Sequence, residues 1–208
     1  MSEPLLQAVD LHCERDDRLL FQGLDIAIVP GTITRVEGPN GSGKTTLLRI
    51  LAGLHDGYSG DILWRTQRRA RCREEFLRNL LYIGHRPGVK SLLTPLENLR
   101  ALMAGRQRHP DKNLRAALDG SGLGGFHDVP CQNLSAGQQR RVALARLLIS
   151  DEPLWILDEA FTAIDFQGVG RLEQLLAQRV VNGGAVVLTT HHPLALSGMQ
   201  RLQLGQAA

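Results

Sequence analysis

Residues 38 to 45 constrain this chain more than any other stretch, because they read Gly-Pro-Asn-Gly-Ser-Gly-Lys-Thr. The stretch fits the pattern G-x-x-x-x-G-K-[ST] without a mismatch. Glycines tolerate the positive φ angles of a tight turn, so successive N–H groups can point inward around an anion. Lys44 and Thr45 then stand where the outer phosphates and Mg²⁺ of a nucleotide would lie. The stretch therefore predicts a phosphate-binding loop.

The flanking residues supply the context that such a loop requires. Residues 32–37 alternate as a strand does, and residues 46–52 have a helical pattern that ends at Gly53. A glycine-rich turn that binds nothing is the alternative, and the strand and helix around it argue against that alternative. The residues expected to contact the nucleotide are Gly38, Pro39, Asn40, Gly41, Ser42, Gly43, Lys44, Thr45 and Thr46.

Strands and helices alternate along the rest of the chain. Early antiparallel strands are expected at 5–12 and 24–29 and buried strands at 80–84, 154–157 and 185–190, with helices at about 94–104, 111–119, 135–148 and 166–181. The helix that Ser135 begins is expected to be the longest. We predict an α/β fold with a mainly parallel sheet core, an N-terminal antiparallel β-subdomain and a small helical subdomain. One domain over 1–208 is expected, with its core at about 1–85 and 131–208 and a helical insert at about 90–130.

Composition narrows the class of protein further. No apolar run approaches 18 residues, so no membrane span is expected. Cys13, Cys72 and Cys131 match neither a disulfide framework nor a metal-ligand spacing and are expected to be free thiols. Residues 61–80 hold six arginines and three acidic residues. Their excess of three positive charges equals the formal net charge of the whole chain, +3. This segment could contact anionic lipid or form a solvated face. Nucleic acid is not expected, because no aromatic residues alternate with the arginines.

Two further stretches carry groups suited to phosphate chemistry. Asp158 and Glu159 close an apolar strand, where a second magnesium-binding element belongs in a protein with this loop. Asp158 would hold Mg²⁺ opposite Thr45, and Glu159 would take a proton from an attacking water. The alternative is that Asp158 and Glu159 are only an ordinary polar end of a strand, without a catalytic role. Residues 134–138 begin a helix with a hydroxyl cap and small residues, so either a phosphate approaches its amides or the stretch is only a capped helix.

These stretches together resemble the ATP-binding-cassette (ABC) ATPases. Leu134–Gln138 is similar to their signature sequence, with Ala136 in place of the first glycine, and the resemblance implies that Ser135, Gly137 and Gln138 contact ATP. Thr162–Asp165 is similar to their D-loop. His191 matches the switch histidine that contacts the γ-phosphate, although the adjacent His192 could share that assignment.

The resemblance covers nearly the whole chain and implies a P-loop NTPase fold, ATP and Mg²⁺ as ligands, and hydrolysis of ATP. It also implies a head-to-tail dimer in which the P-loop of one copy and the signature of the other sandwich ATP. Two positions depart from the family pattern. His85 stands where the Q-loop glutamine is usual, and its imidazole could still ligate the metal. Arg15 falls near the aromatic position that stacks on adenine, and a guanidinium plane can stack on a base.

Leu20–Leu24, Ile83–Lys90 and Leu154–Asp165 more closely resemble the ATP-binding subunits of bacterial cytochrome c maturation (Ccm) systems, long called haem exporters. This resemblance implies an integral membrane permease subunit as partner, further haem-handling membrane subunits, and a peripheral position on the cytoplasmic side of the bacterial inner membrane. The ATPase would then free a haem-loaded periplasmic chaperone.

Other functions stay open at this point. The chain could serve an ABC transporter for another substrate, or act as a soluble ABC ATPase on ribosomes or DNA. A second cassette or a long coiled coil, usual in the soluble forms, is absent from the sequence. A kinase or GTPase-like switch is the third alternative, and the signature and His191 argue against it.

Overall fold

A computed structural model describes residues 3–105 and 109–205, which divide between two units with separate hydrophobic cores. The sheet unit comprises the chain up to Tyr82, Glu152–Glu159 and the chain from Leu176 onward. The helical unit comprises Ile83–Asp151 and Ala160–Leu175. The insert expected at about 90–130 lies within the helical unit, and the single domain with that insert stays a prediction. Residues 1–2, 106–108 and 206–208 of the expected ranges lie outside the described residues.

The first strands of the sheet unit form an antiparallel sheet of strand order β2-β1-β4-β5, which confirms the expected N-terminal β-subdomain. Its strands are β1 (Leu6–Arg15), β2 (Arg18–Ile28), β4 (Ser59–Trp64) and β5 (Gln67–Arg68). Asp16 and Asp17 connect β1 to β2 with φ angles of 52° and 57°. Two successive positive φ angles match the right-handed twist of the paired strands, so this two-residue turn closes a tight hairpin.

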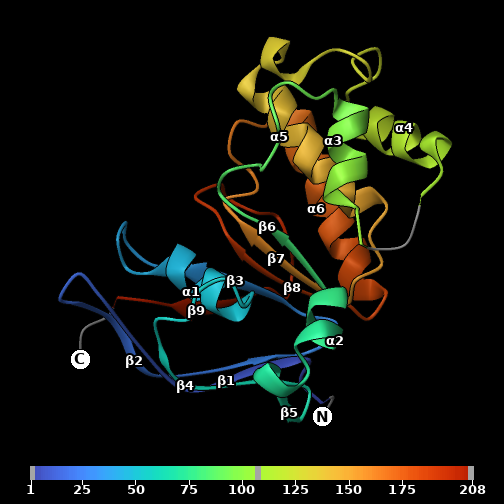
Figure 1. The fold of residues 1–208 in the computed structure, drawn as a ribbon. Helices are drawn as coiled ribbons and strands as arrows, with labels where there is room; N and C mark the ends of the chain where they lie inside the picture. Colours follow the sequence, from blue (N-terminus) through green and yellow to red (C-terminus); the bar gives the residue numbers. More distant parts are fainter. Residues whose placement is uncertain (1–2, 106–108, 206–208) are drawn as a thin grey trace. The chain divides into compact units, whose positions relative to one another are not determined.

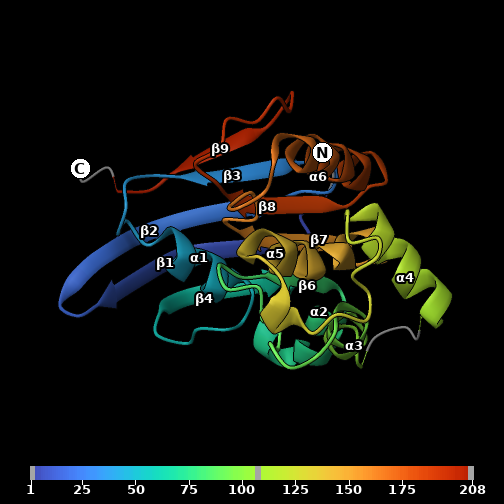
Figure 2. The ribbon, with the colours of Figure 1, turned by 90° about the horizontal axis from the view of Figure 1, so that it is seen from above.

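A five-stranded sheet of order β6-β7-β8-β3-β9 forms the rest of the sheet unit, and β3, β7, β8 and β9 run parallel within it (Figures 1 and 2). Its strands are β3 (Ile33–Glu37), β6 (Leu80–Ile83), β7 (Leu154–Asp158), β8 (Ala185–Thr189) and β9 (Gln200–Gln203). All residues of β7 and β8 are buried, as apolar strands of a parallel sheet are. Their carboxyl ends meet at one edge of the sheet, where ligands of such folds bind.

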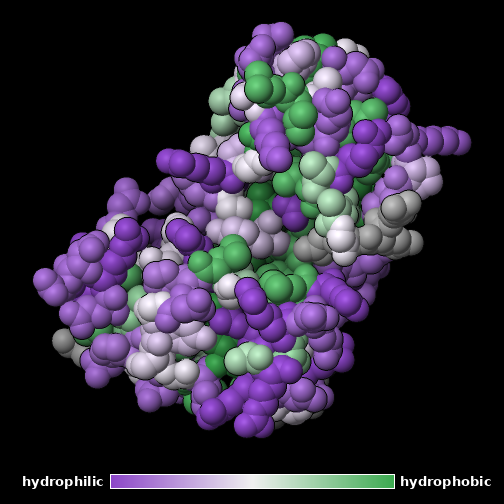
Figure 3. All heavy atoms as spheres, viewed as in Figure 1, coloured by the Kyte–Doolittle hydropathy of each residue, from purple (hydrophilic) through white to green (hydrophobic). Residues whose placement is uncertain are grey.

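The arginine-rich segment of the sheet unit continues from β5 into a short 3-10 helix (Arg69–Arg71) and α2 (Arg73–Arg78). Three of its arginines form ion pairs with neighbouring carboxylates: Arg65 with Glu75, Arg68 with Asp61, and Arg78 with Glu74. Hydrophilic residues dominate the lower part of the face in Figure 3, where β5 lies. These carboxylates offset the charge of three arginines, and the solvated face and the contact with anionic lipid both stay predictions.

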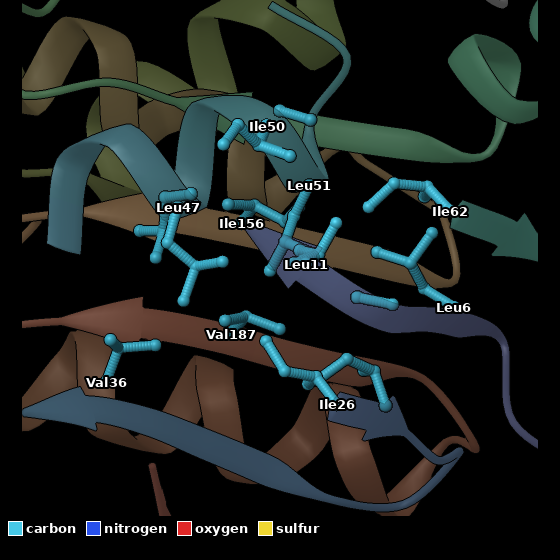
Figure 4. Packing of buried hydrophobic residues seen from close by; sticks show 14 of the residues in the cluster. Leu6, Leu11, Ile26, Val36, Leu47, Ile50, Leu51, Ile62, Ile156 and Val187 are labelled. Atoms are coloured by element: carbon cyan, nitrogen blue, oxygen red, sulfur yellow. The ribbon is translucent and has the colours of Figure 1, made fainter. Parts of the chain in front are cut away.

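Helix α1 (Lys44–Leu51) packs its apolar face into the core of the sheet unit. Leu47, Ile50 and Leu51 of α1 are fully buried. In Figure 4, Leu51 lies near Leu11 of β1 and Ile156 of β7, and all of these residues belong to one hydrophobic core that contains α1 and both sheets. This packing holds the start of α1, and therefore the loop before it, at the carboxyl edge of the parallel sheet.

The helical unit contains α3 (Pro95–Leu102), α4 (Asp111–Gly120), α5 (Ala136–Leu144) and the first part of α6 (Phe166–Val181). Thr94 caps α3 in the expected capping box with Glu97. The expectation that the helix after Ser135 is the longest is wrong: α5 ends at Leu144 and continues only as a 3-10 helix to Leu148, whereas α6 has 16 residues. Short 3-10 turns are common where an α-helix ends. No helix in the described ranges has the length and apolar character that a bilayer crossing requires.

Candidate active site

The glycine-rich loop between β3 and α1 has the backbone that the sequence predicts. Gly38, Gly41 and Gly43 have φ angles of 147°, 80° and 93°. A Cβ on Gly38 would lie 2.6 Å from the carbonyl oxygen of Leu204, so only glycine fits there. Gly43 is the N-cap of α1 without a side-chain hydrogen bond, and the first turn of α1 holds no acidic residue. The amides at this helix start therefore face a position suited to an anion.

Two polar side chains of the loop, Lys44 and Ser42, are also suited to binding a phosphate. Nζ of Lys44 donates to the carbonyl oxygens of Gly38 (2.7 Å) and Pro39 (3.0 Å), so the ammonium lies across the loop. The hydroxyl of Ser42 is buried and has no hydrogen-bond partner among the residues that the structure describes. A buried hydroxyl without a partner costs free energy, and a phosphate oxygen would supply the missing contact.

Asp158, at the end of β7, meets the loop as expected. Its carboxylate is buried, and Oδ1 accepts hydrogen bonds from the hydroxyl of Thr45 (3.2 Å) and of Thr189 (2.8 Å). Thr45 and Asp158 thus place two oxygen donors side by side, which fits Mg²⁺. The described residues contain no group of three or more histidine, cysteine or acidic side chains that could hold a metal ion.

Glu159 and His191 come together at the same edge of the sheet. Oε1 of Glu159 lies 3.6 Å from Nε2 of His191. The Glu159 side chain is 14% exposed and that of His191 is 69% exposed, so the carboxylate is largely buried while the imidazole is open to solvent. The backbone N–H of the neighbouring His192 donates to the hydroxyl of Thr190. The assignment of His191 as the switch histidine stays a prediction.

Thr189 is a residue of this site that the sequence analysis overlooked. Its hydroxyl donates to Asp158 and accepts a hydrogen bond of 2.9 Å from the backbone N–H of Glu159. One side chain thus holds both acidic residues in place, while Glu159 has a left-handed φ angle of 52°. The residues pair because β7 and β8 are parallel with Asp158 opposite Thr189. The only feature of the sequence that could have indicated Thr189 as a site residue is its position at the end of a buried apolar strand.

The signature stretch forms the start of α5 in the helical unit. The hydroxyl of Ser135 accepts from the N–H of Gln138 (3.2 Å), and Oε1 of Gln138 accepts from the N–H of Ser135 (2.9 Å). The structure therefore confirms that Ser135 caps a helix. The contacts of Ser135 and Gln138 with ATP stay predictions. A Cβ on Gly137 would lie 2.6 Å from the carbonyl oxygen of Ala163, so this glycine allows the D-loop backbone to approach α5.

Asp165 at the end of the D-loop ties two helices of the helical unit together. Its carboxylate accepts from the N–H of Gly168 in α6 (2.8 Å) and pairs with Arg141 of α5. The hydrogen bond from Gly168 and the charge of Arg141 lower the pKa of Asp165. Asp165 therefore stays ionised, and the D-loop is held next to the signature helix.

His85 and Arg15 are the two remaining candidates. His85 belongs to the helical unit, where it is exposed, whereas Thr45 and Asp158 belong to the sheet unit. Its role as a metal ligand stays a prediction. Arg15 is exposed in the β1–β2 hairpin and pairs with Asp16 at 3.4 Å. Its stacking on adenine also stays a prediction.

Arg18 in the same hairpin is a second residue that the sequence analysis overlooked. Its Nη1 lies 3.4 Å from the position of a Cβ on Gly41. The hairpin therefore brings this arginine to the phosphate-binding loop.

The three cysteines are free, as expected. Burial raises the pKa of Cys13 and of Cys131, so both thiols stay protonated near neutral pH.

Known proteins resemble this chain in sequence and in fold. The family described as ABC transporter matches residues 21–162. The cytochrome c biogenesis ATP-binding export protein CcmA of Hahella chejuensis is 55% identical over 203 residues, which cover 97% of this chain and 96% of that protein. The solved structure of an ATP-binding subunit of an ABC transporter has a TM-score of 0.84 at 23% identity and covers 96% of this chain and 85% of its own. A dimeric, post-hydrolysis ATP-binding cassette with ADP and Pi has a TM-score of 0.77 at 24% identity, with 90% and 88% covered.

Proposed function

The chain belongs to the ATP-binding subunits of the ABC transporter family, among the cytochrome c biogenesis export proteins, and on this premise we propose that it drives a membrane complex that handles haem. The observation that carries the proposal is the 55% identity to CcmA of Hahella chejuensis over nearly the full length of both proteins. The identity weighs against a soluble ATPase on ribosomes or DNA and against a transporter for another substrate. As an ABC-type ATPase, the chain binds and hydrolyses ATP.

The loop Gly38–Thr45 would hold the phosphates of ATP through its backbone amides and the positive end of α1. Lys44 would turn from the carbonyls of Gly38 and Pro39 to the outer phosphates. Thr45 and Asp158 would hold Mg²⁺ between them, with Thr189 fixing the carboxylate of Asp158. The bound ion supplies positive charge that offsets the charge of the phosphates.

Glu159 is the proposed general base. Its carboxylate would take the proton of the water that attacks the γ-phosphate, and the breaking bond would leave ADP and phosphate. His191, within 3.6 Å of Glu159, would orient that carboxylate and donate a hydrogen bond to the γ-phosphate. Glu159 is largely covered and its backbone is fixed by Thr189, so the base is held at one position.

A second copy of the chain would complete each site. Ser135, Gly137 and Gln138 lie in the helical unit, and the phosphate-binding loop lies in the sheet unit. In a head-to-tail dimer, the signature of one copy would cover ATP held by the other. The dimeric cassette with ADP and Pi, similar to this chain in fold, supports such an assembly.

The proposed membrane partner is the permease subunit of the Ccm system, with further haem-handling subunits around it. The dimer would lie peripherally on the cytoplasmic side of the inner membrane. ATP binding would close the dimer and hydrolysis would reopen it, and this population shift would release the haem-loaded chaperone on the other side.

Genetic complementation tests the proposal directly. Expression of the chain in a bacterium that lacks its own Ccm ATP-binding subunit should restore c-type cytochromes, measured by haem staining of separated proteins. The matched control is Glu159→Gln, which should bind ATP, reach the same protein level and fail to restore cytochromes. Turnover of this variant should fall by roughly 10²–10⁴.

Purification of the wild-type chain from membranes identifies its partner. We expect the Ccm permease to purify with it. An unrelated permease in its place, or restoration of cytochromes by the Glu159→Gln variant, would contradict the proposed function.

A further inference from the structure

Arg140 is a buried arginine to which the proposed mechanism gives no role. It lies in the second turn of α5 and is 4% exposed. Burying a guanidinium costs much free energy unless hydrogen bonds replace the lost water. The groups that accept hydrogen bonds from its guanidinium therefore show what this buried charge stabilises.

The guanidinium of Arg140 binds the segment that carries His85. Its Nη1 donates to the carbonyl oxygens of Gly84 (2.8 Å) and His85 (3.0 Å). These carbonyls follow β6, in a stretch without regular secondary structure. A charge-assisted hydrogen bond to each is stronger than one between neutral groups. The backbone at His85 is thereby fastened to α5.

The neighbours of Arg140 face other parts of the helical unit, because successive residues of a helix point about 100° apart. Gln139 donates to the carbonyl oxygen of Cys131 (2.8 Å), before the signature. Arg141 pairs with Asp165 of the D-loop. Of these three side chains, Arg140 is the one that joins the signature helix to the Q-loop position.

We propose that Arg140 is a positioning residue that couples the two ATP sites of the dimer. This inference rests on the proposed function, in which the signature serves the site of the partner copy, and on the prediction that His85, at the Q-loop position, serves the site of its own copy. Because Arg140 holds both within one unit, a displacement of the backbone at His85 is passed to the start of α5. Occupation of one site then changes the affinity of the other, which is a coupling free energy between sites.

Two measurements on the full-length chain test the coupling. Arg140→Met keeps an unbranched apolar stem of similar reach and removes both hydrogen bonds. We expect the backbone amide of Lys90, which donates to Oδ1 of Asn98, to exchange at least about tenfold faster. We also expect the Hill coefficient for ATP in the ATPase reaction, which lies between 1 and about 2 for two coupled sites, to fall toward 1.

Two further variants make the result specific. Arg140→Lys keeps the charge and at least one contact, so it should restore part of the Hill coefficient; it also serves if Arg140→Met does not fold. Arg100→Met removes an exposed ion pair with Asp111 in the same unit and should change neither measurement.

The results distinguish a coupling role of Arg140 from a purely structural one. Faster exchange with an unchanged Hill coefficient would show that Arg140 is only structural and would overturn the coupling. A wild-type Hill coefficient of 1 would overturn it as well. A wild-type chain without ATPase activity would instead overturn the proposed function, which the coupling presupposes.

Discussion

At the scale of single residues, Thr189 illustrates how one hydroxyl can organise two acidic residues. The hydroxyl donates to Asp158 and accepts from the backbone N–H of Glu159. Neither bond can be replaced by water without a rearrangement, because Thr189 is buried. The positions of the two carboxylates, which are proposed to bind the metal and to act as the general base, therefore depend on a residue that would touch neither the nucleotide nor the water.

Replacement of Thr189 by valine keeps the shape of the side chain and removes its hydroxyl. An unsatisfied buried polar group costs about 1–3 kcal/mol, so we expect kcat to fall by roughly tenfold to a hundredfold. The variant Thr189→Ser retains the hydroxyl and should stay within a few fold of wild type. Steady-state ATPase assays at saturating ATP compare the three proteins. Equal kcat values for the valine and serine variants would contradict the positioning role.

Gly137 has a packing reason for being glycine besides its predicted contact with ATP. A Cβ there would lie 2.6 Å from the backbone oxygen of Ala163, closer than a Cβ atom approaches its neighbours in folded proteins. Gly137→Ala should therefore displace the D-loop from α5. Because the phosphate-binding loop belongs to the sheet unit, we expect ATP binding to survive and turnover to fall by about tenfold or more. Fluorescent-nucleotide binding and ATPase assays separate the two effects.

Gly170 of α6 is the matched control for Gly137. A Cβ on Gly170 would meet no atom within 4 Å. Alanine within a helix is favoured over glycine by roughly 0.5–1 kcal/mol, so Gly170→Ala should be as active as wild type and slightly more stable. A loss of activity in both variants would show that the helical unit tolerates no added methyl group, which would refute the specific role of the approach to Ala163.

The sequence predicts the site residues that stand next to one another in a recognisable motif. It misses those that reach the site only through the pairing of strands. Gly38–Thr45 and Asp158–Glu159 are recognisable because each stretch carries its own pattern. Thr189 and Arg18 are not, because they reach the site through pairing of strands or closure of a hairpin. No local pattern encodes which residue of one strand lies opposite which residue of another.

At the scale of elements, the long apolar strands and the capped helices agree with the sequence patterns, and the short elements do not follow from them. β5 has two residues and β9 has four with no buried member, so neither carries a hydrophobic period. The strand order β6-β7-β8-β3-β9 was also beyond prediction. It is decided by the packing of α1 and the sheets, which involves residues far apart in the chain.

The helix of the phosphate-binding loop depends on a buried charge at its far end. Arg69 donates through Nη1 to the carbonyl oxygens of Ile50 and Leu51, where α1 ends, and through Nη2 to the hydroxyl of Tyr58 (3.1 Å). Its guanidinium also lies over the ring of Phe76. Burial lowers the pKa of Arg69. A cation at the C-terminus of a helix offsets the negative end of the helix dipole.

Removal of this charge should destabilise the sheet unit. Arg69→Met leaves the carbonyl oxygen of Leu51 without its donor, and we expect the free energy of unfolding to fall by about 1–3 kcal/mol. Arg68→Met is the control, because it removes an exposed pair with Asp61 and should change stability by less than about 1 kcal/mol. Urea denaturation followed by circular dichroism measures both. Equal stability of the two variants would show that α1 does not need this contact.

At the scale of the whole molecule, the proposed head-to-tail dimer requires each chain to contribute halves of two different ATP sites. Glu159 belongs to the sheet unit with the phosphate-binding loop, and Gly137 belongs to the helical unit with the signature. In a head-to-tail dimer, these residues of one chain serve different sites. Two variants that are each inactive should then be able to complement each other in one dimer.

We predict that a mixture of Gly137→Ala and Glu159→Gln chains regains ATPase activity. In the mixed dimer, the loop of the first variant and the signature of the second form one intact site. Random association makes half of the dimers mixed, so the activity should reach at most about a quarter of wild type. A mixture of Lys44→Ala with Glu159→Gln is the control, because both changes lie in the loop half and every site stays defective. ATPase assays of the mixtures decide, and no gain in the first mixture would refute the shared site.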